Sequence, residues 1–197
     1  MQVKIIRKTE QKTSQWSGGT TTQLAIFPER ATYDQRDFLF RISTAQVLTE
    51  ESEFTSLPGI WRSIMILEGN LSLNHEGHYS KTLQKFDCDS FDGGWKTKSS
   101  GKVTDFNLMT SSQATGTLLG KTLQPQQTCT EIDCKNHEVV GIYLLCGTAE
   151  IGCNGKKYII GENDFLMVFF ELDFDKIKLM AHEYCEIAVA VIQMNQS

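Results

Sequence analysis

The sequence predicts an all-β protein built as a sandwich or a barrel, and three observations lead to this prediction. Apolar and polar residues alternate with a period of two over most of the chain, which is typical of strands with one buried face. Short turns, many of them containing glycine, separate these segments at intervals of roughly 8 to 12 residues, the spacing found in sandwiches and barrels. No segment shows the periodicity of an amphipathic helix.

Individual strands can be placed along the chain from this alternation. In the segment 38–43, apolar residues occupy the even positions, while Arg41 and Ser43 share the opposite face. Further along, Asn154 and Gly155 form a two-residue hairpin signal, because both tolerate positive φ angles. The predicted strands, in chain order, are 21–27, 38–43, 62–73, 103–110, 139–152, 157–160, 164–170 and 185–194.

An internal repeat refines this prediction. Residues 64–73 and 142–151, which lie 78 positions apart, share the pattern apolar-apolar-Leu-x-Gly-x-apolar-x-apolar, and residues 89–91 similarly match 163–165. Any two hairpins with a glycine turn could match over ten residues, but continuity across three elements favours duplication. The pattern resembles the cupin double-stranded β-helix, so two copies would make a bicupin with two jelly-roll barrels in one chain.

The duplication predicts a division of the chain into two barrels. Residues 1–115 would form an N-terminal cupin barrel with a ligand pocket, and residues 116–197 a C-terminal cupin-like barrel. The stretch from about 110 to 135 is rich in Ser, Thr and Gln, contains Pro125 and shows little periodicity. We therefore expect it to be the linker.

The positions at which metal-binding cupins carry their ligands hold other residues here. Arg62 stands where such a cupin has its glutamate, about seven residues before Gly69, and positions 55–57 contain no histidine. His75 and His78 follow that glycine and flank a turn, so we expect them to be solvated hairpin residues. The sequence therefore predicts neither a metal nor another cofactor.

Polar groups gather instead on the segments expected to line the first barrel. A guanidinium group inside a barrel is costly unless an anion or a hydrogen-bond partner meets it. Asp105 is such a partner and would lock the barrel if it paired with Arg41 or Arg62. Two arginines exceed one aspartate, however, which leaves one guanidinium for a ligand carboxylate. The candidate ligand-binding residues are Trp16, Gly18, Gly19, Thr21, Arg41, Ser43, Arg62, Asp105 and Asn107.

These segments resemble the HutD/Ves family of the RmlC-like cupin superfamily. The resemblance rests on five motifs in order: Trp16-x-Gly-Gly-x-Thr-Thr, Arg36-Asp-Phe-x-Phe-Arg-Ile-Ser-x-Ala45, Phe54-x-x-Leu-Pro-Gly-x-x-Arg62, Leu67-Glu-Gly69 and Asp105-Phe-Asn-Leu-Met109. The first motif departs from the family's common form, which is Trp-x-Asn-Gly-Gly-Gly followed by Thr-Arg-Glu. This chain therefore lacks an asparagine and an arginine of that form.

The resemblance implies a metal-free cytoplasmic protein that is often a dimer and that is associated in some bacteria with histidine utilisation. Members are proposed to bind an acidic intermediate such as formylglutamate or urocanate and to restrain expression of the pathway. The Ves branch is linked to cold or stress response. No catalytic activity is firmly assigned to the family.

Charge and hydropathy agree with such a role. The chain has 19 Lys and Arg against 24 Asp and Glu, a net charge of −5, which disfavours nucleic acid and anionic membranes as partners. All five arginines lie within the first 62 residues. No apolar run is long enough for a membrane helix and no apolar leader is visible, so we expect a cytoplasmic protein.

Three functional hypotheses follow. The first is binding of a small carboxylate metabolite through Arg62 and Arg41, without catalysis. The second is a metal-independent isomerase or hydrolase in which Asp105 is the base and Arg62 stabilises an oxyanion, although nearby arginines should lower the pKa of Asp105. The third is a structural or partner-binding protein in which Arg62 is fully paired with Asp105 and leaves no room for a ligand.

Overall fold

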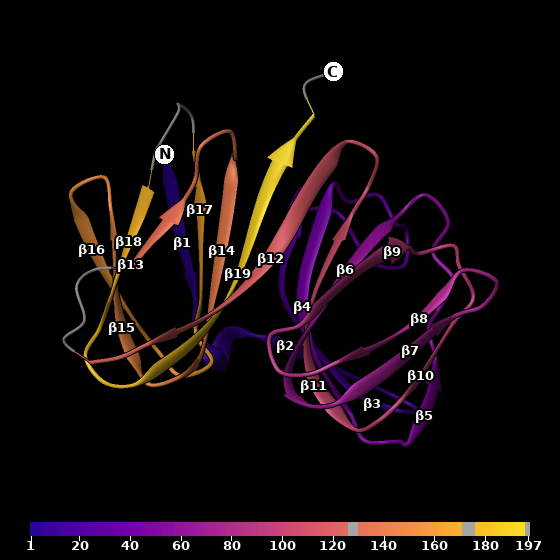
Figure 1. Ribbon diagram of the computed structural model, residues 1–197. Helices are drawn as coiled ribbons and strands as arrows, with labels where there is room; N and C mark the ends of the chain where they lie inside the picture. The colour runs from indigo at the N-terminus through magenta and orange to yellow at the C-terminus, as the bar shows by residue number, and fades with distance from the viewer. Residues whose placement is uncertain (126–129, 171–175, 196–197) are drawn as a thin grey trace. The chain divides into compact units, whose positions relative to one another are not determined.

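Strands dominate the fold, as the alternation predicts. The computed structural model describes residues 1–125, 130–170 and 176–195, and it contains nineteen strands and one short 3₁₀ helix, Lys8–Glu10 (Figure 1). No helix in this part of the chain is long and apolar enough to cross a membrane. The chain divides into an N-terminal unit, Lys12–Leu118 with Asn195, and a C-terminal unit, Met1–Gln11 with Leu119–Met194.

The N-terminal unit contains two antiparallel sheets. The six-stranded sheet has the order β2 (Lys12–Trp16), β3 (Gly19–Phe27), β4 (Phe40–Val47), β11 (Val103–Thr110), β6 (Trp61–Gly69), β9 (Cys88–Asp92). The four-stranded sheet has the order β5 (Glu51–Glu53), β10 (Thr97–Ser100), β7 (Leu71–His75), β8 (Tyr79–Leu83). Side chains such as Ile66, Leu73 and Phe91 form a core from both sheets.

The C-terminal unit also contains two sheets. The five-stranded sheet has the order β1 (Gln2–Ile6), β17 (Phe165–Phe169), β14 (Val139–Cys146), β19 (Cys185–Met194), β12 (Ala114–Leu123). The part of β12 up to Leu118 is assigned to the N-terminal unit. The four-stranded sheet has the order β13 (Thr130–Asp133), β18 (Lys176–Ala181), β15 (Thr148–Cys153), β16 (Lys156–Gly161). The core of this unit consists of aliphatic side chains such as Ile142, Ile151 and Val189.

The same order of strands recurs in the two units, as the internal repeat predicts. The sheet order β4-β11-β6-β9 corresponds to β12-β19-β14-β17, and β5-β10-β7-β8 corresponds to β13-β18-β15-β16. Gly69 and Gly147, which are aligned by the repeat, have φ angles of 86° and 85°. Both therefore occupy the left-handed region that favours glycine, at the turn between equivalent strands.

Several predicted boundaries differ from the structure. The segments 62–73 and 139–152 each form two strands rather than one, because these two glycines turn the chain inside them. The expected linker at about 110–135 contains β12 and β13. The division between the units falls after residue 118 rather than 115, and residues 1–11 belong to the C-terminal unit because β1 pairs with β17.

Asp164 holds residues 1–11 in the C-terminal unit through hydrogen bonds to Arg7 and Lys8. Its Oδ2 accepts hydrogen bonds from Arg7 Nη1 at 2.7 Å and from the Gly161 amide at 3.0 Å, and its Oδ1 accepts one from the Lys8 amide at 3.1 Å. Burial raises the pKa of Asp164, but these donors outweigh burial, so its pKa lies below the usual range. The ionised carboxylate therefore stabilises the fold.

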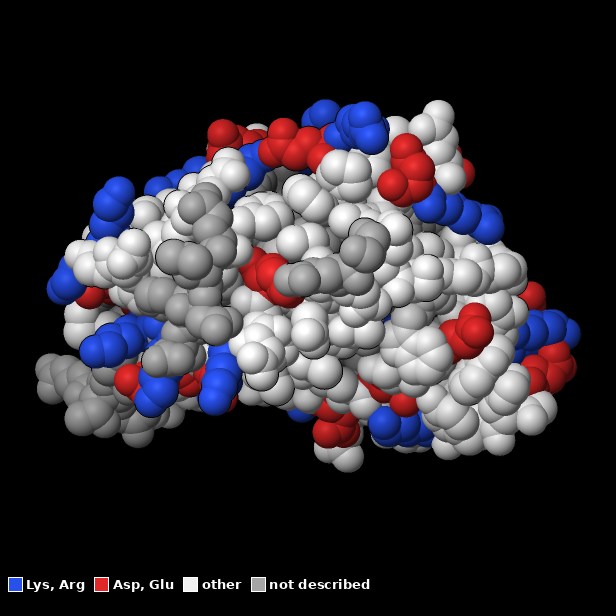
Figure 2. Space-filling view, turned by 90° about the horizontal axis from the view of Figure 1, so that it is seen from above, with Lys and Arg blue, Asp and Glu red and all other residues white. Residues whose placement is uncertain are grey.

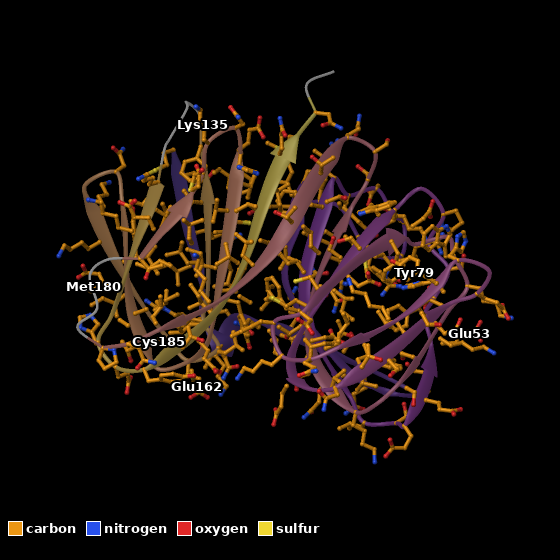
Figure 3. The ribbon with its side chains drawn as sticks, in the orientation of Figure 1. Glu53, Tyr79, Lys135, Glu162, Met180 and Cys185 are labelled. Atoms are coloured by element: carbon orange, nitrogen blue, oxygen red, sulfur yellow. The ribbon has the colours of Figure 1, made fainter. Side chains whose placement is uncertain are left out.

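We expect Asp164→Asn to loosen β1. The amide protons of β1 should exchange about tenfold faster, because charge-assisted hydrogen bonds are lost. At pH 6 the wild-type carboxylate is ionised, so the difference in exchange rate between the two proteins should be at its largest. It should shrink as the pH falls through the lowered pKa of Asp164, where the wild-type carboxyl also becomes neutral. Exposed Glu162 (Figure 3), two residues earlier, provides the control Glu162→Gln, and equal exchange in the two variants would contradict the prediction.

Candidate functional site

A cavity of about 450 Å³ lies within the N-terminal unit. Strands β2, β3, β4, β6 and β11 of the six-stranded sheet supply most of its wall, and Ser17, Tyr33 and residues 53–55 supply the rest. The lining residues are Ser14, Trp16, Ser17, Thr21, Tyr33, Arg41, Ser43, Ala45, Glu53, Phe54, Thr55, Arg62, Asp105, Asn107 and Met109.

Strand register arranges the polar side chains of this wall in rows across the sheet. In the first row, Met109 on β11 lies between Arg41 on β4 and Arg62 on β6. Asn107 pairs with Ser43 in the second row. Asp105 pairs with Ala45, and Ala45 pairs with Thr21 of β3, in the third row. The two guanidinium groups and the aspartate therefore occupy different rows of one sheet face.

Arg62 is held by aromatic side chains and makes few hydrogen bonds. Its guanidinium carbon lies 4.5 Å from the centre of the Phe54 ring and 5.7 Å from that of Phe91. Its Nη1 donates to the backbone carbonyl of Thr55 at 3.3 Å. Burial lowers its pKa to about 10, so the group remains cationic at neutral pH. Most of its five N–H donors have no acceptor among the described residues, which suits recognition of an anion.

Arg41 is positioned more completely by its neighbours. Its Nε donates to Gln23 Oε1 at 3.0 Å, its Nη1 donates to Ser43 Oγ at 3.2 Å, and the guanidinium carbon lies 4.7 Å from the centre of the Tyr33 ring. The side chain is buried, and burial lowers its pKa from the ordinary value. None of its described partners is a carboxylate, so its positive charge is not neutralised by direct pairing within the unit.

Asp105 is a buried carboxyl group with an unusual pKa. Only 4% of the residue is exposed, and this burial raises the pKa to about 7, against opposing effects of Asn107, Arg62 and the Ala45 amide. Asn107 Nδ2 donates a hydrogen bond to Asp105 Oδ1. Within the described residues, no ion pair joins Asp105 to either arginine. The expectation of a lowered pKa for Asp105 is therefore wrong: Arg62 does act to lower it, but the cost of burial exceeds this attraction.

The structure brings seven of the nine candidate residues together on the cavity wall, all except Gly18 and Gly19. A Cβ atom on Gly18 would collide with the ring of Trp16, and one on Gly19 would collide with the backbone carbonyl of Gln46. These glycines therefore permit close packing of β2 and β3 with their neighbours. The expectation that they allow close approach to a ligand is not supported by their positions.

Several lining residues are absent from the sequence-based candidates. The alternation could have indicated two of them: Ala45 shares a face of β4 with Arg41, and Met109 shares a face of β11 with Asn107. Tyr33 and the segment 53–55 lie outside strong strand patterns, and no comparable signal marks them. Glu53 matters most, because it adds a second acidic group and makes the acidic side chains of the wall equal in number to its two arginines.

His75 corrects another expectation. The residue is only 1% exposed rather than solvated: its Nε2 hydrogen-bonds to Asp89 Oδ2 at 2.9 Å, and its Nδ1 to Thr97 Oγ1 at 2.8 Å. His78 is exposed and stacks on Trp95 with ring centres 3.7 Å apart. His75 is thus part of a buried polar network, which the hairpin spacing alone did not indicate.

The cavity wall does not fit a divalent metal ion. No histidine or cysteine lines it, and its two acidic side chains, Asp105 and Glu53, share the space with two guanidinium groups. Elsewhere in residues 1–125, 130–170 and 176–195, no group of three His, Cys, Asp or Glu side chains is placed to hold a metal.

The family model named HutD matches residues 8–188. The chain belongs to the HutD family. This match extends the resemblance seen at residues 16–109 over both units. A comparison with curated proteins found no match.

Solved structures support the HutD assignment at the level of the fold. PA5104 from Pseudomonas aeruginosa PAO1, described as a conserved protein of unknown function, matches with a TM-score of 0.83 and 21% identity over 98% of this chain and 100% of that one. HutD from Pseudomonas fluorescens SBW25 matches with a TM-score of 0.76 and 18% identity over 99% and 100%. Bacterial pirin YhhW from Escherichia coli matches with a TM-score of 0.70 and 11% identity over 99% and 100%. This HutD-family chain therefore has a cupin-like all-β fold.

Proposed function

We propose that this HutD-family protein binds a small carboxylate metabolite in the cavity of its N-terminal unit, without catalysis and with a regulatory role. The observation that carries the proposal is Arg62, a partly buried guanidinium with few internal acceptors beside an open cavity. A ligand carboxylate would accept two parallel hydrogen bonds from such a group and would offset its desolvation.

The other lining groups would orient the ligand. Arg41 adds a second positive charge in the same row, and Asn107 and Ser43 supply polar atoms beside it. The third hypothesis, a fully paired Arg62 with no space beside it, does not fit a cavity of about 450 Å³. Family resemblance adds a cytoplasmic location, a homodimer, and a role in histidine utilisation or stress response to the proposal.

We infer further that the chain is a bicupin with one jelly-roll barrel in each unit. The support is the recurrence of the strand order and of the paired glycine turns. The ligand pocket would belong to the N-terminal barrel. The C-terminal unit contains one arginine, Arg7, and none within residues 119–194. We therefore assign the C-terminal barrel to packing or dimerisation.

Surface charge favours a small molecule over a polyanion as the partner. Figure 2 shows Lys and Arg side chains interspersed with Asp and Glu on the visible described surface, rather than gathered into one basic area. Nucleic acid and anionic lipid surfaces bind to concentrated positive charge. We therefore propose neither as a partner.

Thermal denaturation with a panel of acids tests the proposal. The panel is formate, propionate, glutamate, urocanate and formylglutamate; formate is included because the Pseudomonas fluorescens HutD structure was solved in a formate condition. A ligand at 100 times its Kd should add about 2.7 kcal/mol to the free energy of unfolding. Arg62→Ala should weaken binding by about 10- to 100-fold, because a charge-assisted contact is lost.

The matched control is Arg30→Ala, which removes an exposed arginine that does not line the cavity. It should leave binding unchanged. Stabilisation of equal size in the Arg62→Ala variant, or none with any acid, would refute carboxylate binding at this site.

Asp105 supports an alternative, a metal-independent isomerase or hydrolase acting on a small acid. A carboxyl group with a pKa of about 7 can exchange protons near neutral pH, as a general acid or base must, and it lines the cavity with Arg62. The test is to incubate the wild type with the acids of the panel and to detect products by NMR. Turnover that Asp105→Asn abolishes, with the fold intact by circular dichroism, would establish catalysis in place of pure binding.

A further inference from the structure

We propose that a second cavity of the N-terminal unit is a binding site for a neutral sugar ring, a hexopyranose. This cavity has a volume of about 380 Å³, within the range of about 300 to 1,000 Å³ that is usual for small-molecule sites. Its wall comes from the start of β6, the end of β9 and the chain that leads from β11 into β12. It shares no lining residue with the cavity that contains Arg62.

One row across the six-stranded sheet forms the centre of this second cavity. Trp61, the first residue of β6, pairs with Thr110 on β11 and with Asp92 on β9, and all three line the cavity. Side chains of directly paired residues project from the same face of a sheet, with Cβ atoms about 5 Å apart. The register therefore places an indole ring between a hydroxyl group and a carboxylate, on the sheet face opposite to that of Arg62.

Trp61 provides an apolar platform. The residue is 48% exposed although its strand has a paired neighbour on both sides. One face of a hexopyranose carries mainly C–H groups, and such a face packs on a flat aromatic ring. This contact removes apolar surface of both partners from water, which favours binding.

Asp92 and several hydroxyl groups supply the polar contacts. Asp92 Oδ1 accepts a hydrogen bond from the Gly94 amide at 2.7 Å, whereas Oδ2 accepts none within the described residues. Thr110, Ser111 and Thr115 add hydroxyl groups, each of which can donate and accept. Sugar hydroxyl groups also donate and accept, so they can pair with this set of groups around the edge of the ring.

Backbone hydrogen bonds tie together the loops before β6 and after β9. The Leu57 amide donates to the Gly93 carbonyl at 2.6 Å, and the Gly93 amide donates to the Ile60 carbonyl at 2.8 Å. A Cβ atom on Gly93 would lie 2.7 Å from the Ile60 carbonyl oxygen, so this close approach requires glycine. The loops thus hold Trp61 and Asp92 in place before a ligand arrives, which lowers the entropic cost of binding.

The lining disfavours other classes of small molecule. None of the described residues that line the cavity is a lysine or an arginine, so an anion would meet Asp92 without a counter-charge. Trp61 is the one aromatic residue among them, whereas sites for quaternary ammonium ions surround the cation with several rings. A neutral ring that carries hydroxyl groups uses the indole and the polar groups together.

Titration followed by NMR tests the proposal. Glucose, galactose, mannose and N-acetylglucosamine are added in turn to the isotopically labelled full-length protein, and the tryptophan indole N–H signals are recorded. The signal that is absent from Trp61→Phe identifies Trp61. At least one sugar should shift this signal with a Kd on the order of 1 mM, because one ring and a few hydrogen bonds give weak binding. Sorbitol, an open-chain relative of glucose without the ring, should cause no comparable shift.

Saturation-transfer difference NMR, which observes the sugar, measures binding to the variants. Trp61→Ala should weaken binding at least tenfold, because the platform is lost. Asp92→Asn should weaken it by about three- to tenfold, because the charged acceptor is lost while an amide oxygen remains for the Gly94 amide. The matched control is Tyr184→Ala, which removes a 46% exposed aromatic ring from the C-terminal unit and should leave binding unchanged.

The wild-type titration can overturn the proposal without any variant. It fails if none of the four sugars shifts the Trp61 signal, or if sorbitol shifts it equally. A shift with tetramethylammonium and with no sugar would assign the cavity to a cation instead. A signal that responds to protein concentration and to no sugar would assign it to a second copy of the chain. Unchanged sugar binding in Trp61→Ala would place the sugar elsewhere and would also overturn the proposal.

Discussion

Replacing Asp105 with asparagine is expected to stabilise the protein at pH 8 and to change its stability little at pH 4. The pKa of Asp105 is about 7 in the folded protein, against an ordinary value of 3.8. Between these values the folded protein holds a proton that the unfolded chain has released. The free energy of unfolding of the wild type must therefore fall as the pH rises through this window.

The size of the effect is on the order of a few kcal/mol at pH 8, where both states of the wild type are ionised and the folded state carries the cost of a buried charge. Asparagine has nearly the same shape and no charge, so it removes this cost. Urea denaturation of both proteins at intervals from pH 4 to pH 8 measures the difference. The same substitution at exposed Asp34 is the matched control and should leave the pH profile unchanged.

Parallel profiles for the wild type and Asp105→Asn would show that Asp105 is not destabilising. The expected divergence would have a functional meaning, because a residue that costs stability at neutral pH serves some purpose other than folding. Its position on the cavity wall agrees with the proposed role of this cavity in ligand binding.

The fold was predictable where alternation is strong, and the site was predictable where it lies on such strands. Val103–Thr110 and Cys185–Met194 form strands with the predicted bounds, and the faces assigned to Arg41 and Ser43 are those that line the cavity. The strands β1, β5 and β10 were missed because they are only three to five residues long. Their pairing depends on partners distant in the sequence, which a local pattern cannot indicate.

The electrostatics of the site could not be predicted from the sequence. Counting charges placed Asp105 beside cations and implied a lowered pKa, whereas burial raises it. Hairpin spacing placed His75 in solvent, whereas its side chain is directed into the fold toward Asp89. In both cases the deciding quantity is burial, which depends on residues distant in the sequence that the fold brings close to the group.

Asp89→Ala is expected to destabilise the N-terminal unit by about 3 kcal/mol, because it removes the acceptor at the centre of a buried network. Asp89 accepts hydrogen bonds from His75 Nε2 at 2.9 Å, from the Tyr79 hydroxyl at 3.1 Å and from Lys81 Nζ at 3.2 Å. Tyr79, labelled in Figure 3, comes from β8 of the four-stranded sheet, whereas Asp89 lies on β9 of the six-stranded sheet. The carboxyl group therefore joins the two sheets.

The loss should come mainly from His75. Tyr79 and Lys81 are exposed enough to bond to water when the carboxylate is removed, but His75 is not and would be left with an unsatisfied ring nitrogen. Asp89→Asn should therefore cost less than Asp89→Ala, because its amide oxygen can still accept from His75. Glu76→Ala is the control: it breaks an exposed ion pair with Lys96 in the same unit and should not measurably change the denaturation midpoint. Similar midpoints for Asp89→Ala and the wild type would mean that packing of the aromatic rings around His75, rather than this carboxylate, holds the two sheets together.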